Sequence, residues 1–315
     1  MMLGLGLELN QWACRLAQRP GGAAGHRAAV LAVAPDTERE TAPAGGERIM
    51  GKVFLNEFST AELEAMFAAG AIDSAITVFG SCESHGDHLP LGPDLFVPTE
   101  VARQAAQRLA RTIVVPGVPF GTSMLYNANP MAITLRFETV TAIAEDMFES
   151  LIAYDIRHIF VLNGHDGNIA PLEIAQRKVK QRHPEVVFAF MPAWWYVVGN
   201  LLGDNFFAEW DGLGLGLGLG HGGEGETSIT MAVRPELCDL SKAVRHMPDD
   251  NIRIGERVQI MWDIAEVSAT GATGDPTHAS AEKGRKMLDA LVRLVVDSVS
   301  ELDEEGGVTI AASEC

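Results

Sequence analysis

The chain has 315 residues, of which 47% are hydrophobic and 21% are charged, and 24 basic against 42 acidic residues give a formal net charge of −18. This composition excludes a disordered or fibrous chain and is typical of one compact domain or two small ones. An acidic surface repels phosphate backbones and anionic lipid headgroups, so we expect neither nucleic-acid binding nor membrane-surface binding. The expected partners are cations, metals and small polar molecules.

The first 49 residues differ in composition from the rest of the chain. They contain five arginines and five acidic residues, so the whole of the −18 charge belongs to residues 50–315. They are rich in alanine, glycine and proline and have no sustained helical or strand period. Met50 opens a segment, MGKVFLNEF, that looks like a natural protein start. We therefore predict that residues 1–49 are a poorly ordered or non-native N-terminal extension and that residues 50–315 form the folded domain.

From residue 50 onward, helical and strand patterns alternate. Leu63, Met66 and Phe67 have helical spacing behind a capping residue at Ser59 or Thr60. In chain order, the patterns predict a helix over 60–69, a strand over 75–80, a helix over 97–110, a strand over 112–115, a helix over 139–154, a strand over 158–162, a helix over 168–182, a strand over 186–190 and a helix over 279–302. Strands that alternate with helices in this way predict an α/β fold with three α/β/α layers and a mainly parallel central sheet.

The cysteines and the N-terminus carry no signal for export or membrane insertion. No CxxC pair occurs among the cysteines, so neither a disulfide framework nor a zinc knuckle is predicted. No apolar run approaches the roughly 20 residues that span a bilayer, and polar residues interrupt residues 3–17. We expect a cytoplasmic protein.

Three polar segments contain the side chains that bind metals. The segments 80–94 (GSCESHGDHLPLGPD) and 163–168 (NGHDGN) follow predicted strands, and 221–228 (HGGEGETS) precedes an apolar run. Ligands of parallel sheets bind beyond the carboxyl ends of the strands. Glutamate, histidine and aspartate bind divalent first-row metals. A single histidine in such a loop is usually structural, but three segments together favour a site for one or two metal ions.

These segments resemble the signature segments of the creatininase (creatinine amidohydrolase) family in order and spacing. The resemblance implies a creatininase-like fold and a metal centre bound by Glu83, His85, Asp94 and His165, with Asp94 as the bridging ligand. Creatininase has a further ligand glutamate where this chain has Gly167. The resemblance therefore leaves open whether one or two ions bind, and whether Glu226, Glu224 or water takes the missing place. The expected ions are Zn, Mn or Fe, and the expected ligand is Glu226.

The resemblance also implies catalytic and substrate-binding residues. His221 matches a family histidine that does acid–base work, and we expect Glu224 to assist it. The substrate-binding residues implied are Ser123, Asp166, Trp210 and Asp211. Many relatives carry histidine where this chain has Tyr126, and Asp166 stands where creatininase has an aromatic residue. A carboxylate there suits a hydroxyl-rich ligand better than a methylated ring, so creatinine itself is not the expected substrate.

Three further features have structural interpretations. We predict that His88 supports the site without binding metal, and that the run Trp194-Trp195-Tyr196 anchors a helix in the core or in a subunit interface, with ligand stacking as the alternative. The repeat GLGLGLGLG over 212–220 is expected to be a flexible lid or an expanded repeat, with a strand as the alternative.

The function predicted is a metal-dependent hydrolase that opens a small cyclic substrate. A keto-inositol (3-dehydro-scyllo-inosose) or another sugar-derived ring is favoured, which would imply inositol or carbohydrate catabolism, and a cyclic amide is also considered. A metal-dependent polyol isomerase or lyase and a non-catalytic scaffold of the same fold remain alternatives. The family resemblance implies a homo-oligomer, a hexamer.

Overall fold

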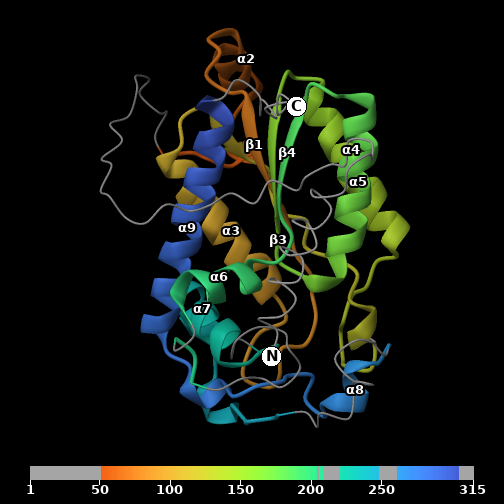
Figure 1. Cartoon of the computed structure of the whole chain (residues 1–315), viewed down its shortest axis with the longest axis vertical. Coiled ribbons are helices and arrows are strands. Elements are labelled where there is room, and N and C mark those ends of the chain that lie inside the picture. The colour runs from red at the N-terminus through yellow and green to blue at the C-terminus, as the bar shows by residue number, and fades with distance from the viewer. Residues whose placement is uncertain (1–50, 204–205, 209–219, 248–260, 305–315) are drawn as a thin grey trace, which may run out of the picture. The chain divides into compact units, whose positions relative to one another are not determined.

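A four-stranded parallel sheet in the order β2-β1-β3-β4 forms the centre of the fold (Figure 1). The computed structural model describes residues 51–203, 206–208, 220–247 and 261–304. The strands are β1 (Ser74–Phe79), β2 (Thr112–Val114), β3 (His158–Asn163) and β4 (Val187–Met191). The predicted extension over 1–49 lies outside the described residues.

Both faces of the sheet are buried, because alternate side chains of each strand enter two separate hydrophobic clusters. In β1, Ile76 and Val78 pack into one cluster, and Ala75 and Phe79 pack into the other. The strands run in register, with Ser74 of β1 opposite both Thr112 of β2 and His158 of β3. The carboxyl ends of β1 and β3 therefore lie side by side.

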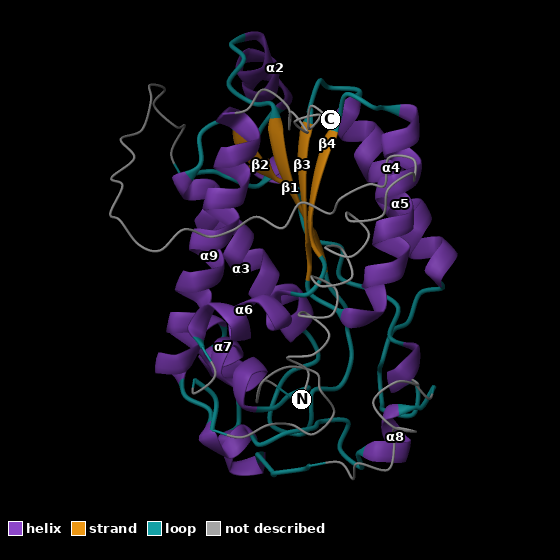
Figure 2. Ribbon diagram, viewed as in Figure 1, coloured by secondary structure: helices purple, strands orange, loops and turns teal. Residues whose placement is uncertain are grey.

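Helices cover the two faces of the sheet as separate layers (Figure 2). One face carries α3, α6, α7 and α9, and the other carries α4 and α5. The helices are α2 (Thr60–Ala68), α3 (Pro93–Arg108), α4 (Phe137–Ile152), α5 (Ile169–Arg182), α6 (Trp194–Leu202), α7 (Glu224–Val233), α8 (Ile264–Val267) and α9 (Ala281–Glu304). The predicted three-layer α/β/α fold is confirmed. Among the described helices, none is long and apolar enough to cross a membrane.

Two helices that carry site residues begin at residues that the sequence patterns do not predict. The helix predicted from Val97 begins at Pro93, because proline suits the first helical position, where no amide hydrogen is needed. The apolar run after residue 228 is the second half of α7, which begins at Glu224. Asp94, Glu224 and Glu226 therefore lie in the first turns of helices, where the helix dipole favours negative charge.

The two tryptophans at the start of α6 anchor that helix in the core, one of the two places predicted. Trp194 and Trp195 are 2% and 6% exposed and belong to the hydrophobic cluster on the α9 side of the sheet.

Candidate functional site

The three polar segments meet at the carboxyl ends of β1 and β3. The loop after β1 supplies Glu83 and His85, the first turn of α3 supplies Asp94, the loop after β3 supplies His165, and the first turn of α7 supplies Glu226. All five residues are buried, with exposed fractions of 6% or less. We call these five residues the metal-ligand cluster.

Asp94 is shared between two groups of ligand atoms. In the first group, Nδ1 of His165 lies 3.2 Å from Oε1 of Glu83 and 3.2 Å from Oδ2 of Asp94. In the second group, Nε2 of His85 lies 3.1 Å from Oδ1 of Asp94 and 3.7 Å from Oε2 of Glu226. Each carboxylate oxygen of Asp94 thus faces one group, the arrangement that a bridging ligand requires.

Backbone carbonyl groups fix the orientation of three histidine rings. Nε2 of His165 donates to the Thr122 carbonyl oxygen at 3.0 Å, and Nδ1 of His85 donates to that of Glu83 at 3.2 Å. Nε2 of His221 donates to the Ser84 carbonyl oxygen at 2.7 Å. Because a carbonyl oxygen only accepts hydrogen bonds, these ring nitrogens carry hydrogen. Such outer contacts are usual for metal-binding histidines, since they leave the other nitrogen free to bind a cation.

Glu83 provides a direct test of whether a cation fits here. Both of its carboxylate oxygens are buried and accept no hydrogen bond, although Oε1 lies 3.2 Å from Nδ1 of His165. A buried carboxylate without donors is strongly unfavourable unless a positive charge compensates it. The atoms around it, carboxylate oxygen and imidazole nitrogen, are the donors that Zn and Mn bind. The residues present therefore fit a divalent cation.

Without cations, the metal-ligand cluster shares protons between its acids and its histidines. Burial lowers the pKa of His85, but the charges of Asp94, Glu226 and Glu83 outweigh burial and raise the pKa to about 10. Burial raises the pKa of Glu226 to about 7. Burial also lowers the pKa of His165, yet Glu83 and Asp94 raise it well above its usual value. A cation that binds here must displace these protons, so metal binding releases protons to the solvent.

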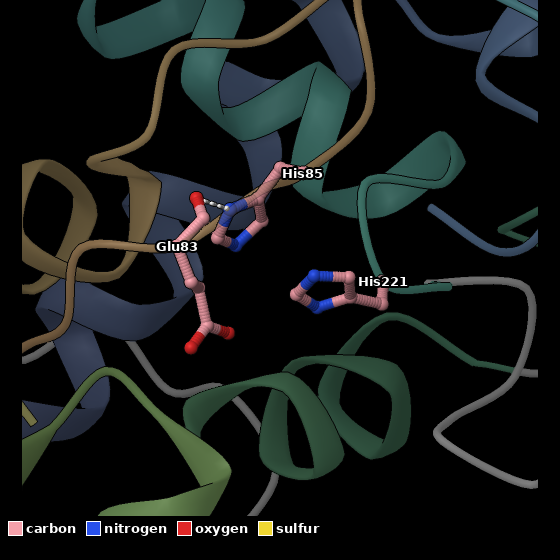
Figure 3. A group of neighbouring side chains, drawn as sticks. All are labelled: Glu83, His85 and His221. Carbon is pink, nitrogen blue, oxygen red and sulfur yellow. Dashed lines mark hydrogen bonds between the residues drawn. The ribbon is translucent and has the colours of Figure 1, made fainter. Parts of the chain in front are cut away.

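His221 lies beside this cluster and stays neutral. Its ring is 4.3 Å from the ring of His85, centroid to centroid (Figure 3), and its Nδ1 is 3.8 Å from Oε2 of Glu226. Burial and the nearby charge of His85 lower the pKa of His221 to about 3. Glu83, His85 and His221 also offer ligand atoms within 4.8 Å of one another, so this histidine is close enough to act on anything held by the cluster.

A pocket of about 190 Å³ opens onto the metal-ligand cluster. It includes the predicted residues Asp166 and His221. The predicted residue Ser123 is fully buried but does not line the pocket; its neighbour Thr122 does. The wall also contains Leu125, Met261 and Trp262, which were not predicted, together with Tyr126 and Trp195, and for Trp195 ligand stacking was the predicted alternative. Trp195 therefore serves both the core and the pocket, while Trp210, Asp211 and residues 212–219 lie outside the described residues.

His88 has the supporting position that was predicted for it. Its Nε2 lies 3.0 Å from the Gly222 carbonyl oxygen and 2.9 Å from the Thr227 hydroxyl. These contacts tie the loop after β1 to the start of α7, which carries Glu226.

Gly167 leaves no room for the ligand glutamate that the family resemblance implies at this position. A Cβ atom there would lie 2.1 Å from the Thr122 carbonyl oxygen and 2.7 Å from Nε2 of His165. With this backbone, a side chain at 167 would break the hydrogen bond that orients His165. Glu226, which reaches the cluster from α7, occupies the second group instead.

The structure does not bring Glu224 into the pocket. Its Oε1 pairs with the ammonium group of Lys283 on α9, and its Oε2 accepts a hydrogen bond from the Ala208 backbone amide at 2.7 Å. Its side chain is 1% exposed. Glu224 therefore connects α7, α9 and residue 208. Its expected catalytic role stays a prediction.

Replacing Lys283 by methionine should lower the free energy of unfolding by about 3 kcal/mol, because it leaves the Glu224 carboxylate buried without its cation. Urea denaturation at matched metal content measures this. The control is Lys286→Met. Lys286 forms an exposed ion pair with Glu282 on the same helix, so this change should alter the free energy of unfolding by less than about 0.5 kcal/mol. A Lys283→Met protein of unchanged stability that had lost metal would instead place Glu224 in the metal site.

The chain matches one family model and several known proteins in sequence. The creatininase family model, described as creatinine amidohydrolase, matches residues 56–299. Creatinine amidohydrolase of Pseudomonas putida is 28% identical over 264 residues, which cover 79% of this chain and 96% of that protein. Mycofactocin precursor peptide peptidase of Mycobacterium ulcerans (strain Agy99) is 27% identical over 239 residues, which cover 73% and 84%.

Solved structures agree with these sequence matches. A mutant creatininase of Zn-Zn type superposes with a TM-score of 0.67 at 27% identity, over 79% of this chain and 98% of that one. The manganese form of creatininase gives a TM-score of 0.65 at the same identity and coverage.

Proposed function

The chain belongs to the creatininase family of hydrolases, and we propose that it hydrolyses a small cyclic substrate with the help of two divalent cations held around Asp94. The observation that carries this proposal is the division of the metal-ligand cluster into two groups that share Asp94. Glu83, Asp94 and His165 would hold one cation, and His85, Asp94 and Glu226 would hold the other. The Zn-Zn and Mn forms of creatininase support Zn or Mn, and Fe suits the same ligands.

Divalent cations, when bound, lower the pKa of a water molecule and polarise a substrate carbonyl group. His221 is the group of this chain that would move protons. Its Nε2 donates to the Ser84 carbonyl oxygen, so its Nδ1 is the free basic nitrogen, and it faces Glu226. A neutral imidazole in this position can take a proton from the attacking water and return it to the leaving group.

The pocket favours a small ring as substrate. A volume of about 190 Å³ is below the usual range for drug-sized ligands, which begins at about 300 Å³. Among the described residues that line it, none is lysine or arginine. The Asp166 carboxylate lies in the wall with no hydrogen bond to a described residue, and a carboxylate there suits the hydroxyl groups of a sugar-derived ring such as a keto-inositol. A cyclic amide is the second ring considered, because the Pseudomonas putida relative is a creatinine amidohydrolase.

A ring screen with metal analysis on the same sample tests the proposal. Cyclic polyol ketones, lactams and lactones would be offered in ¹⁸O-labelled water, and product and metal content would be measured together. We expect one solvent oxygen in a new carboxylate, and loss of both metal and activity after treatment with a chelator. A metal-free preparation of full activity would contradict the proposal, and a product without solvent oxygen would identify an isomerase or lyase. The same preparation would show by its mass in solution whether the chain forms the expected hexamer.

A further inference from the structure

Two hydroxyl groups in the pocket wall lack hydrogen-bond partners. Oγ1 of Thr122 is buried and has none. The phenol of Tyr126 lines the same pocket, and its hydroxyl makes no hydrogen bond within the described part of the chain. Both residues belong to the segment that follows β2. An unpaired buried hydroxyl costs about 1–3 kcal/mol, so that of Thr122 indicates a ligand atom that it binds, and the Tyr126 hydroxyl in the same wall is available to the same atom.

The backbone of Thr122 is held from both sides. Its amide donates to Oδ1 of Asn168 at 3.0 Å, and its carbonyl oxygen accepts from Nε2 of His165 at 3.0 Å. Asn168 in turn donates to the Gly80 carbonyl oxygen at 3.0 Å. The hydrogen bonds with Asn168 and His165 therefore fix the backbone that carries the Thr122 hydroxyl.

Burial and contact with His221 fix the position of the Tyr126 ring. It is 6% exposed and packs against the His221 ring at a centroid distance of 4.6 Å. Its backbone amide donates to the Ser123 carbonyl oxygen at 3.0 Å, which closes the short turn Met124–Tyr126. Phenylalanine would fill the same space, so the packing alone does not require a hydroxyl group here.

The charges around Tyr126 make its hydroxyl a donor. Burial and then the charges of Glu83 and Glu226, with smaller contributions from Asp94 and Asp166, raise the pKa of Tyr126 well above its usual value. The phenol therefore stays protonated beside acceptors to which it is not bonded. A substrate oxygen that gains negative charge would find hydrogen-bond donors at Tyr126 and Thr122.

We propose that the hydroxyl groups of Thr122 and Tyr126 donate hydrogen bonds to the oxygen of the scissile carbonyl group, on which negative charge develops during hydrolysis. Donors fixed before the reaction stabilise this charge without reorganising, which is the basis of an oxyanion hole. The inference rests on the proposed hydrolytic function. It makes both residues catalytic and extends the site beyond the metal-ligand cluster and His221.

Three variants and one control test this inference on the metal-loaded protein. Tyr126→Phe keeps the ring contact with His221, Thr122→Val keeps the side-chain shape, and the double variant removes both donors. Each single change should lower kcat about 100-fold on the ring opened in the screen, with KM changed less than threefold. Thr112→Val removes another buried, unpaired hydroxyl, on β2 and outside the pocket wall, and should leave kcat unchanged. Metal content should stay at the wild-type value in all four, and none of the changes should lower the melting temperature.

Binding of boric acid gives a readout that does not depend on turnover. Boric acid forms a tetrahedral anion, and its dissociation constant, measured by calorimetry, should rise about tenfold in Tyr126→Phe and in Thr122→Val. Wild-type kcat and wild-type boric acid affinity in both would overturn the inference, as would an effect on KM alone. Those results would leave the proposed function intact, because that function fails only if product lacks solvent oxygen or activity survives loss of metal.

Discussion

Replacing Asp94 by asparagine is expected to empty both groups of the metal-ligand cluster and to lower kcat/KM by at least about a thousandfold. The two oxygens of Asp94 face His165 and His85 separately, so one substitution removes a charged ligand from each group. Changes to residues that merely support metal ligands already cost about 10–100-fold in metal affinity or activity, and a shared ligand should cost more. Metal content per chain and steady-state kinetics measure the two effects.

The control for this experiment lies in the loop that precedes α3. Asp87 is exposed and outside the metal-ligand cluster, so Asp87→Asn removes one negative charge without removing a ligand and should keep metal and activity. Circular dichroism must show that the Asp94→Asn protein is folded. A folded Asp94→Asn protein that hydrolysed substrate at nearly the wild-type rate would rule out Asp94 as the shared ligand. If neither the wild type nor the variant had activity, the non-catalytic scaffold would be favoured.

Replacing Glu226 by glutamine should remove one cation of two and lower kcat/KM about 100-fold. Glu226 supplies the only carboxylate of the second group apart from Asp94, and Gly167 offers no substitute. The first group, Glu83, Asp94 and His165, does not include Glu226 and should keep its cation. The metal content should therefore fall from two ions per chain to one.

Glu224→Gln is the matched control, because it makes the same change two residues away on the same helix. It should keep two ions per chain and lose stability, since the Lys283 and Ala208 contacts are weakened. If Glu224→Gln lost an ion while Glu226→Gln kept both, the assignment of the two glutamates would be reversed.

Much of the fold could be predicted because strands buried on both faces are short apolar runs that end at turn residues. All four strands occur within a residue or two of the predicted ranges. The start of α3 could not be predicted, because Gly92-Pro93-Asp94 is equally typical of a tight loop. That four-residue difference matters for the site, since it places Asp94 at a helix N-terminus.

Part of the site could also be predicted from the sequence. Glu83, His85, Asp94 and His165 follow neighbouring parallel strands, so their convergence follows from topology. Glu226 was expected as a ligand and Glu224 as a catalytic residue, but the contacts of Glu224 with Lys283 and Ala208 could not be predicted. Residues two positions apart lie on opposite sides of a helix, and the sequence did not show that α7 begins at 224. The hydroxyl groups of Thr122 and Tyr126 lie in a segment without periodicity, and only the folded structure shows that they lack partners.

The carbonyl groups that orient His85, His165 and His221 belong to Glu83, Thr122 and Ser84. Every amino acid has such a carbonyl group, so substitutions at Ser84 or Thr122 leave unchanged which ring nitrogen faces the cations. The wall of the pocket can therefore acquire side chains for new substrates by single substitutions while the metal centre is inherited intact. An insertion or deletion in these loops would shift the carbonyl groups themselves, so related chains should vary in side chains here far more readily than in loop length.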